Sequence, residues 1–131
     1  MTEVNKEVEV KKEETTFADL GLSPEILAAV EAKGYKNPSP IQAGVIPLLL
    51  NGEKDIVGQA QTGTGKTAAF GLPLLSRIDA SSRDVKGIIL CPTRELAIQV
   101  ANEIKSFSPK NSLTIQLLYG GQPIREEMSG L

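Results

Sequence analysis

The sequence contains no histidine, no tryptophan and a single cysteine, and these absences exclude several kinds of site. Without histidine, the chain can form neither a Ser-His-Asp triad nor a histidine metal site. Cys91 alone can form neither an internal disulfide nor a thiolate metal cluster, and a lone cysteine fits a reducing compartment. The chemistry must therefore come from lysine, arginine, threonine, glutamine, acidic side chains and the backbone.

Net charge and long apolar runs are also scarce. The formal net charge is −2, and the acidic excess lies within residues 1–14, so the rest of the chain is balanced. Any contact with nucleic acid must then be local, through backbone amides or a few side chains. No apolar run approaches the ~18 residues of a membrane span, and the acidic N-terminus is neither a signal peptide nor a transit peptide. We expect a cytoplasmic protein without a membrane segment.

The chain of 131 residues has room for one domain. Residues 1–14 alternate charges and valines without an apolar face, which is typical of a disordered tail. Ser23 and Ser39, each followed by proline, predict two helix starts. The first helix should end at Gly34 and the second near Leu50, bent or shortened by a proline within it.

A different pattern begins at residue 53, where short apolar runs alternate with helical segments. The runs are continuous, as in strands buried on both faces of a parallel sheet. This alternation predicts an α/β fold with a doubly wound parallel sheet. The expected strands are 55–58, 86–91 (with Cys91 buried) and 113–119; the expected helices are 65–78, one from Thr93 and one from Pro123; Leu96, Val100, Ile104 and Phe107 should face the core.

Residues 60–67, Ala-Gln-Thr-Gly-Thr-Gly-Lys-Thr, lie between the first expected strand and its helix. They match the phosphate-binding pattern G-x-x-x-x-G-K-[ST] except for Ala60. Gly63 and Gly65 allow the backbone to direct N–H groups at phosphate oxygens. Lys66 can reach the β- and γ-phosphates, and Thr67 can offer its hydroxyl to Mg²⁺. The sequence therefore predicts a nucleotide site with Lys66 and Thr67 as its catalytic residues.

Other interpretations of this loop are weaker. It could be a glycine-rich turn with an exposed lysine, but strand, loop and helix signals occur together. Residues 63–68 also fit the dinucleotide pattern G-x-G-x-x-A, yet the acid it needs, Asp84, precedes the second strand instead of ending it. No N-K-x-D element follows the loop, which favours adenine over guanine.

One residue upstream of this loop, Gln42, and one downstream of it, Arg94, each allow two interpretations. Gln42 has an amide that can pair with N6 and N7 of adenine, but Ser39 and Gln42 also form a capping-box pattern. Arg94 lies in the first turn of a helix, where its charge opposes the dipole unless a phosphate shares the site. It could instead pair with Glu95, which otherwise reads as structural.

Four sequence motifs follow an upstream aromatic residue, Phe17, in a characteristic order. They are Gly-Tyr-x-x-Pro-x-x-Ile-Gln at 34–42, Ala-x-Thr-Gly-x-Gly-Lys-Thr at 60–67, Pro-Thr-Arg-Glu-Leu-Ala at 92–97, and the Gly-Gly turn at 120–121. In order and spacing the chain resembles the N-terminal part of the first RecA-like domain of bacterial DEAD-box ATP-dependent RNA helicases. The resemblance implies an adenine-recognition (Q-motif) segment at 15–52 and an incomplete RecA-like P-loop domain at 53–131.

The resemblance also implies ATP and Mg²⁺ as cofactors, with the ion held through Thr67 and the nucleotide, and single-stranded or structured RNA as the partner, held through its backbone. The implied ATP-binding residues are Phe17, Tyr35, Gln42, Ala60, Gln61, Thr62, Gly63, Thr64, Gly65, Lys66 and Thr67, and the implied RNA-binding residues are Pro92, Thr93, Arg94, Gly120 and Gly121.

The sequence departs from the family in what it lacks. It has no Asp-Glu-x-Asp element and no second RecA-like domain. We expect the full-length form to hydrolyse ATP in response to RNA and to unwind duplexes, and this chain alone to be inactive in hydrolysis. The alternative is a nucleotide- and RNA-binding fragment without turnover. A third interpretation, another P-loop enzyme such as a small kinase, would be indifferent to Gln42.

Overall fold

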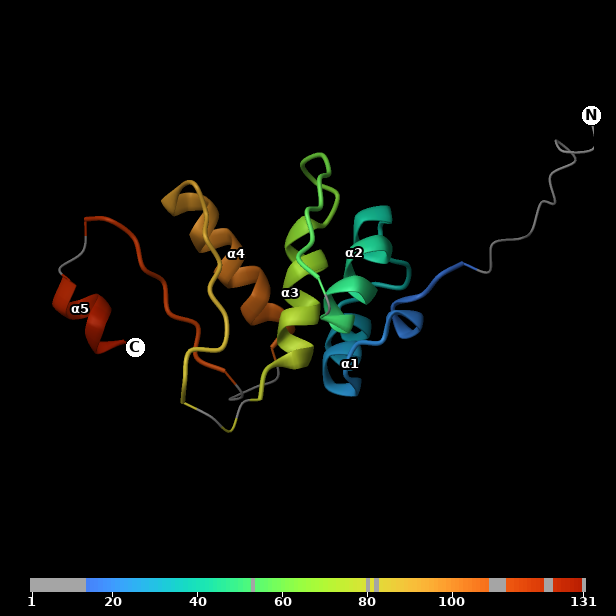
Figure 1. The fold of residues 1–131 in the computed structure, drawn as a ribbon, viewed down its shortest axis with the longest axis horizontal. Coiled ribbons are helices and arrows are strands. Elements are labelled where there is room, and N and C mark those ends of the chain that lie inside the picture. The colour runs from blue at the N-terminus through green and yellow to red at the C-terminus, as the bar shows by residue number, and fades with distance from the viewer. Residues whose placement is uncertain are drawn as a thin grey trace, which may run out of the picture.

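Helices make up all the regular secondary structure that the computed structural model describes, in residues 14–52, 54–79, 81, 83–108, 113–121 and 124–130 (Figure 1). The charged tail expected over residues 1–14 lies outside these residues except for Glu14. Pro123, the expected start of a helix, also lies outside them. In chain order the elements are the 3-10 helix η2 (Phe17–Leu20) and the α-helices α1 (Pro24–Ala32), α2 (Pro40–Asn51), α3 (Lys66–Arg77), α4 (Arg94–Phe107) and α5 (Ile124–Ser129).

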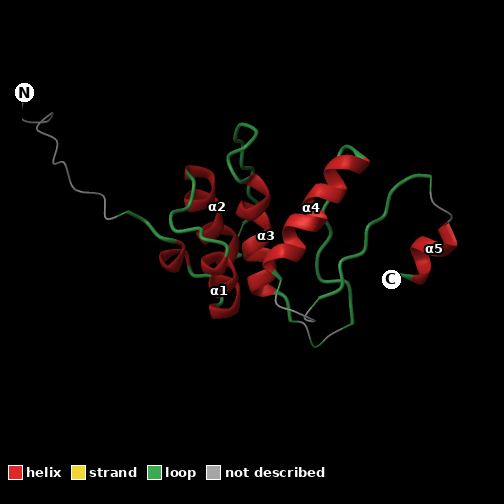
Figure 2. Cartoon of the chain, turned by 180° about the vertical axis from the view of Figure 1, so that it is seen from behind, coloured by secondary structure: helices red, strands yellow, loops and turns green. Residues whose placement is uncertain are grey.

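The expected doubly wound parallel sheet is wrong for the part of the chain described here, which contains no strand (Figure 2). Segments 55–58, 86–91 and 113–119 run as irregular chain. A strand exists only when a neighbour about 4.8 Å away completes a hydrogen-bonded ladder, and no such ladder forms among the described residues. Side chains that a sheet would bury are therefore open to solvent: Val57 is 99% exposed and Leu90 91%. Cys91 is only partly buried.

Local capping signals explain where α1 and α2 begin and end. The hydroxyls of Ser23 and Ser39 each accept the N–H of the third helical residue, at 3.4 Å, and a proline occupies the first turn of both helices. Gly34 follows α1 with φ of +82°, and Gly52 closes α2 with φ of +70°. The expected bounds are confirmed, although α2 continues through Pro47 without being shortened.

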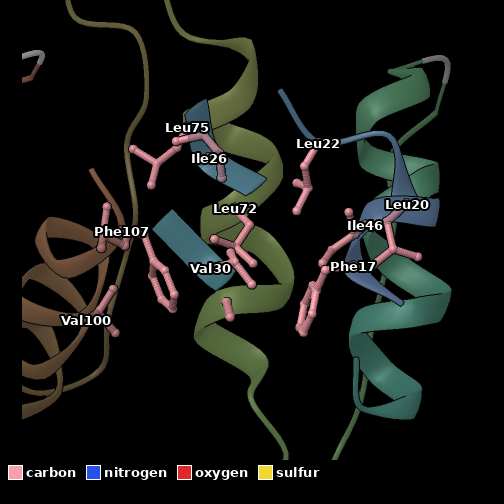
Figure 3. Close-up of a cluster of buried hydrophobic side chains, with 12 residues drawn as sticks. Phe17, Leu20, Leu22, Ile26, Val30, Ile46, Leu72, Leu75, Val100 and Phe107 are labelled. Atoms are coloured by element: carbon pink, nitrogen blue, oxygen red, sulfur yellow. The ribbon is translucent and has the colours of Figure 1, made fainter. Parts of the chain in front are cut away.

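The helix α3 lies at the centre of the packing. It contacts α1, α2 and α4, and both ribbon views place it between α2 and α4 (Figures 1 and 2). Gly71 brings α3 close to α4, because a Cβ at this position would lie 3.3 Å from Ile104. The buried core drawn in Figure 3 consists of Phe17, Leu20, Leu22, Ile26, Val30, Ile46, Ala68, Leu72, Leu75, Val100, Ile104 and Phe107.

The apolar face predicted for α4 is confirmed over most of its length. Val100, Ile104 and Phe107 are buried, whereas Leu96, in the first turn, is exposed. The start of α4 therefore extends beyond the core, toward the residues expected to bind a ligand. None of the described helices is long and apolar enough to cross a membrane.

Candidate functional site

The loop at 60–67 leads directly into α3 and contains two glycines in the left-handed region. Gly63 has φ of +84° and Gly65 of +82°, values that residues with a side chain rarely adopt. The Thr64 hydroxyl donates to the Gln61 carbonyl at 2.6 Å, which closes the turn between them. Ala60 is half-buried at the start of this loop, and Thr62 near its tip is exposed. The glycines thus occupy the positions where the predicted phosphate loop requires them.

The start of α3 differs from the starts of α1, α2 and α4. Those helices are capped by the hydroxyls of Ser23, Ser39 and Thr93, but α3 begins after Gly65 and has no side-chain cap. Its first turn contains no acidic residue either. The first amides of α3, with the positive end of the helix dipole, therefore lack a side-chain acceptor of their own and suit an anion.

Lys66 and Thr67 form the first turn of α3. The Lys66 side chain is exposed, and Thr67 is half-buried. Among the described residues no group of three acidic, cysteine or histidine side chains could hold a metal ion. The Thr67 hydroxyl is an oxygen donor, and together with the oxygens of a nucleotide it would fit the all-oxygen ligand set that Mg²⁺ prefers.

Gln42 joins α2 to the phosphate loop. Its Oε1 accepts the Ser39 N–H at 2.9 Å, and its Nε2 donates to the Gly65 carbonyl at 3.2 Å. The side chain is 9% exposed. The capping box is thus confirmed, and Gln42 also holds the residue that starts α3. An amide oxygen accepts two hydrogen bonds and its NH₂ group donates two, so one of each is left for a base. The adenine contact stays a prediction.

The two aromatic residues expected near the base lie in different environments. Phe17 is 3% exposed and belongs to the core, whereas Tyr35 is 50% exposed. Their ring centroids are 6.4 Å apart, and Tyr35 also lies 6.1 Å from the ring of Phe107 in α4. Tyr35 is therefore partly open to a ligand, and its ring packs against the buried ring of Phe17.

A carboxylate fixes the start of η2. Asp19 accepts the Thr16 N–H at 2.9 Å and the Thr16 hydroxyl at 3.0 Å, and these hydrogen bonds lower the pKa of Asp19 below 3.8. Because the folded pKa is lowered, this contribution to stability is present above pH 3.8 and is lost as the pH falls through the folded pKa.

The residues expected to bind RNA converge from two distant segments. Arg94, at the start of α4, donates from Nη2 to the Gly120 carbonyl at 2.8 Å, and its Cζ lies 4.8 Å from the centre of the Tyr119 ring. Gly121 has φ of +95°, and a Cβ there would lie 3.2 Å from the same Nη2. The Thr93 hydroxyl accepts the Leu96 N–H at 3.2 Å and is exposed. Four of the five expected residues, Thr93, Arg94, Gly120 and Gly121, thus form one exposed cluster, and Pro92 adjoins it in sequence.

Two contacts of this site were not predicted from the sequence. One is the hydrogen bond between Gln42 and Gly65, and the other is the contact of Tyr119 with Arg94. In the described segment 113–119 every second residue is half-buried, starting with Leu113 and Ile115 and ending with Tyr119. That alternation, visible in the sequence as an apolar residue at each odd position, was the available signal for Tyr119. Among the described residues, Arg94 pairs with Gly120 and Tyr119 and not with Glu95.

Comparisons with known proteins show the family of the chain. Residues 39–131 match the family described as DEAD/DEAH box helicase. The DEAD-box ATP-dependent RNA helicase CshA of Bacillus cereus is 52% identical over 117 residues, covering 89% of this chain and 22% of the relative. The ATP-dependent RNA helicase DeaD of Escherichia coli is 54% identical over 110 residues, covering 83% of this chain and 17% of the relative.

Solved structures give the same result. A DEAD box protein from Methanococcus jannaschii has a TM-score of 0.84 at 47% identity, covering 88% of this chain and 32% of that one. Saccharomyces cerevisiae Dbp5, bound to RNA and ADP BeF3, has a TM-score of 0.67 at 41% identity, covering 70% of this chain and 24% of that one. The chain spans about a fifth of the length of the curated relatives it matches. The resemblance to DEAD-box helicases is confirmed: the chain belongs to the DEAD/DEAH box helicase family.

Proposed function

We infer that the chain is the ATP-binding and RNA-binding part of an ATP-dependent RNA helicase. The observation that carries this proposal is the uncapped start of α3, which directly follows the left-handed Gly63 and Gly65 and is held by the Gln42 amide. The names of CshA and DeaD as ATP-dependent RNA helicases support it, as does the structure of Dbp5 with RNA and ADP BeF3. The small-kinase interpretation has no support from this family.

ATP occupies the loop and the first turn of α3. Its phosphates lie on the amides of residues 63–67 and near the Lys66 ammonium, and Mg²⁺ is held by the Thr67 hydroxyl with the phosphates. The adenine pairs with the two remaining hydrogen-bonding positions of Gln42, and the exposed ring of Tyr35 packs on or near the base. Residues 60–62 complete the loop around the phosphates.

RNA binds at the cluster formed by residues 92–94 and 120–121. The exposed guanidinium of Arg94 and the main chain at Gly120 and Gly121 contact the ribose-phosphate backbone, because glycine allows that close approach. Contacts of this kind position RNA without reading its sequence. The site therefore accepts single-stranded or structured RNA of any sequence.

The whole helicase hydrolyses ATP in response to RNA and unwinds duplexes, and it acts in the cytoplasm. This chain alone has no turnover, since its sequence lacks the Asp-Glu-x-Asp carboxylates that would hold Mg²⁺ for hydrolysis. The division into an adenine-recognition segment at 15–52 and a P-loop segment at 53–131 belongs to the same proposal. Taken by itself, the chain is then a nucleotide- and RNA-binding fragment.

Nucleotide titrations of the 131-residue chain by calorimetry test the proposal. Lys66→Ala should weaken ATP binding at least about tenfold, because it removes the main cationic contact to the phosphates. Lys105→Ala, an exposed lysine on α4, is the matched control and should bind as the unaltered chain does. GTP bound as tightly as ATP would refute the adenine contact. RNA-stimulated ATP hydrolysis by this chain alone would refute the absence of turnover.

A further inference from the structure

The Arg94 guanidinium lies against one aromatic ring. Its Cζ is 4.8 Å from the centre of the Tyr119 ring, and its Nη2 donates to the carbonyl of the next residue, Gly120, at 2.8 Å. The ring and the carbonyl come from consecutive residues of one segment. Together they fix both the position and the plane of the guanidinium, which one hydrogen bond alone could not do.

The residues that precede Tyr119 in the chain indicate why its ring faces α4. In segment 113–119 the odd-numbered side chains are half-buried and the even-numbered ones are exposed. Leu113 and Ile115 pack against the core, so Tyr119 lies on the same side of the segment as these anchors. Leu118 points the other way and is exposed. The alternation therefore places the Tyr119 side chain on the packed side of the segment, opposite Leu118.

Arg94 needs such support because its surroundings oppose it. It is the first residue of α4, where the positive end of the helix dipole repels a cation. No acidic partner offsets this charge among the described residues. A quadrupolar ring face and a carbonyl are then the groups that keep an exposed, flexible arginine at this helix start in the absence of a phosphate. The guanidinium keeps further N–H donors for a ligand, since it carries five.

We propose that Tyr119 is a positioning residue for RNA binding, which holds the guanidinium of Arg94 in the orientation that receives an RNA phosphate. The proposal rests on the proposed function, in which Arg94 contacts the RNA backbone. Tyr119 itself makes no contact with the RNA. A cation–π contact at an exposed site corresponds to about a two- to fivefold change in affinity.

Binding of a fluorescent ten-nucleotide polyuridine to the 131-residue chain tests this. Tyr119→Leu and, as a second ring-free variant, Tyr119→Met should weaken binding about two- to fivefold, and Tyr119→Phe, which keeps the ring, should restore it. Leu118→Ala is the matched control from the exposed side of the same segment. Circular dichroism of each variant establishes that α4 is still formed, and either ring-free variant that folds decides the outcome.

A double-mutant cycle separates positioning from a structural or direct role. In an Arg94→Ala background, Tyr119→Leu should cause no further loss of affinity, because the guanidinium that the ring orients is absent. An equal loss in both backgrounds, or no loss in either, overturns the positioning role. Arg94→Ala should also reduce the slope of log K against log salt concentration by about 0.7 in magnitude, which is the value for one phosphate contact with a single strand. If Arg94→Ala changes neither affinity nor salt dependence, the RNA site of the proposed function is wrong instead.

Discussion

At the scale of single residues, Gln42 makes the capping contact that its spacing predicted and a second contact that the sequence did not reveal. Its Oε1 completes the capping box of α2, and its Nε2 reaches across to the carbonyl that precedes α3. The spacing of Ser39 and Gln42 predicted the first contact. The second could not be predicted, because it joins residues 23 positions apart and depends on how α2 packs on α3.

Gln42→Glu isolates the amide nitrogen of this side chain. A carboxylate still accepts the Ser39 N–H, so the capping box survives, but it cannot donate to Gly65 or to N7 of adenine. We expect the helix content to be retained and ATP affinity to fall about tenfold, for the loss of hydrogen bonds at a nearly buried site. Circular dichroism and calorimetric titration measure the two effects.

The purine selectivity of the same variant provides the control. The preference for ATP over GTP should shrink in Gln42→Glu, since it comes from the amide that is removed. If the variant bound ATP with unchanged affinity and selectivity, Gln42 would be a capping residue only.

At the scale of elements, the predicted helices are present, and the predicted strands are absent from the described residues. Serine, threonine, proline and glycine act on their own neighbours within a few residues, so Ser23, Ser39 and Thr93 marked real helix starts, as Gly34 marked the end of α1. A strand requires a partner elsewhere in the chain. The apolar run at 86–91 has the composition of a buried strand, but it forms no hydrogen-bonded ladder with another segment among the described residues.

The same distinction applies to the site. The unusual backbone conformation of the glycines in the phosphate loop could be predicted, because it depends only on the residues of that loop. The contact of Arg94 with Gly120 spans 26 residues, and only the family pattern suggested that the two segments belong together.

Removing the cap of α4 tests how far this helix depends on its N-cap residue, Thr93. Thr93→Ala deletes the oxygen that accepts the Leu96 N–H, and we expect the free energy of unfolding to fall by about 1 kcal/mol. Thr93→Ser keeps that oxygen and should lose only a small part of this. Urea unfolding followed by circular dichroism measures both. An alanine variant as stable as the serine variant would mean that the cap contributes nothing.

At the scale of the whole molecule, the helical core and the exposed apolar segments are distinct regions. Leu72 of α3 is 1% exposed, at the centre of the core, while Leu90 is 91% exposed. The two leucines have the same chemistry and opposite surroundings, so they form a matched pair.

Leu72→Ala should lower the free energy of unfolding by about 2–5 kcal/mol, because it leaves a cavity between α3 and its neighbours. Leu90→Ala should change it by less than about 0.5 kcal/mol, as is usual for exposed positions. Urea unfolding of the two variants provides the comparison. Equal, large losses would show that residues 86–90 are buried in solution, as a sheet would require.

The position of α3 has a consequence for the way ligand and protein depend on each other. The helix whose first amides bind phosphate in the proposed function is also the one on which α1, α2 and α4 pack. If nucleotide binds there as proposed, it should also stabilise the folded protein, by thermodynamic linkage. At a concentration one hundred times its Kd, a ligand specific for the folded state adds about 2.7 kcal/mol to the free energy of unfolding. Loss of nucleotide would then loosen the whole helical cluster, and not only the loop.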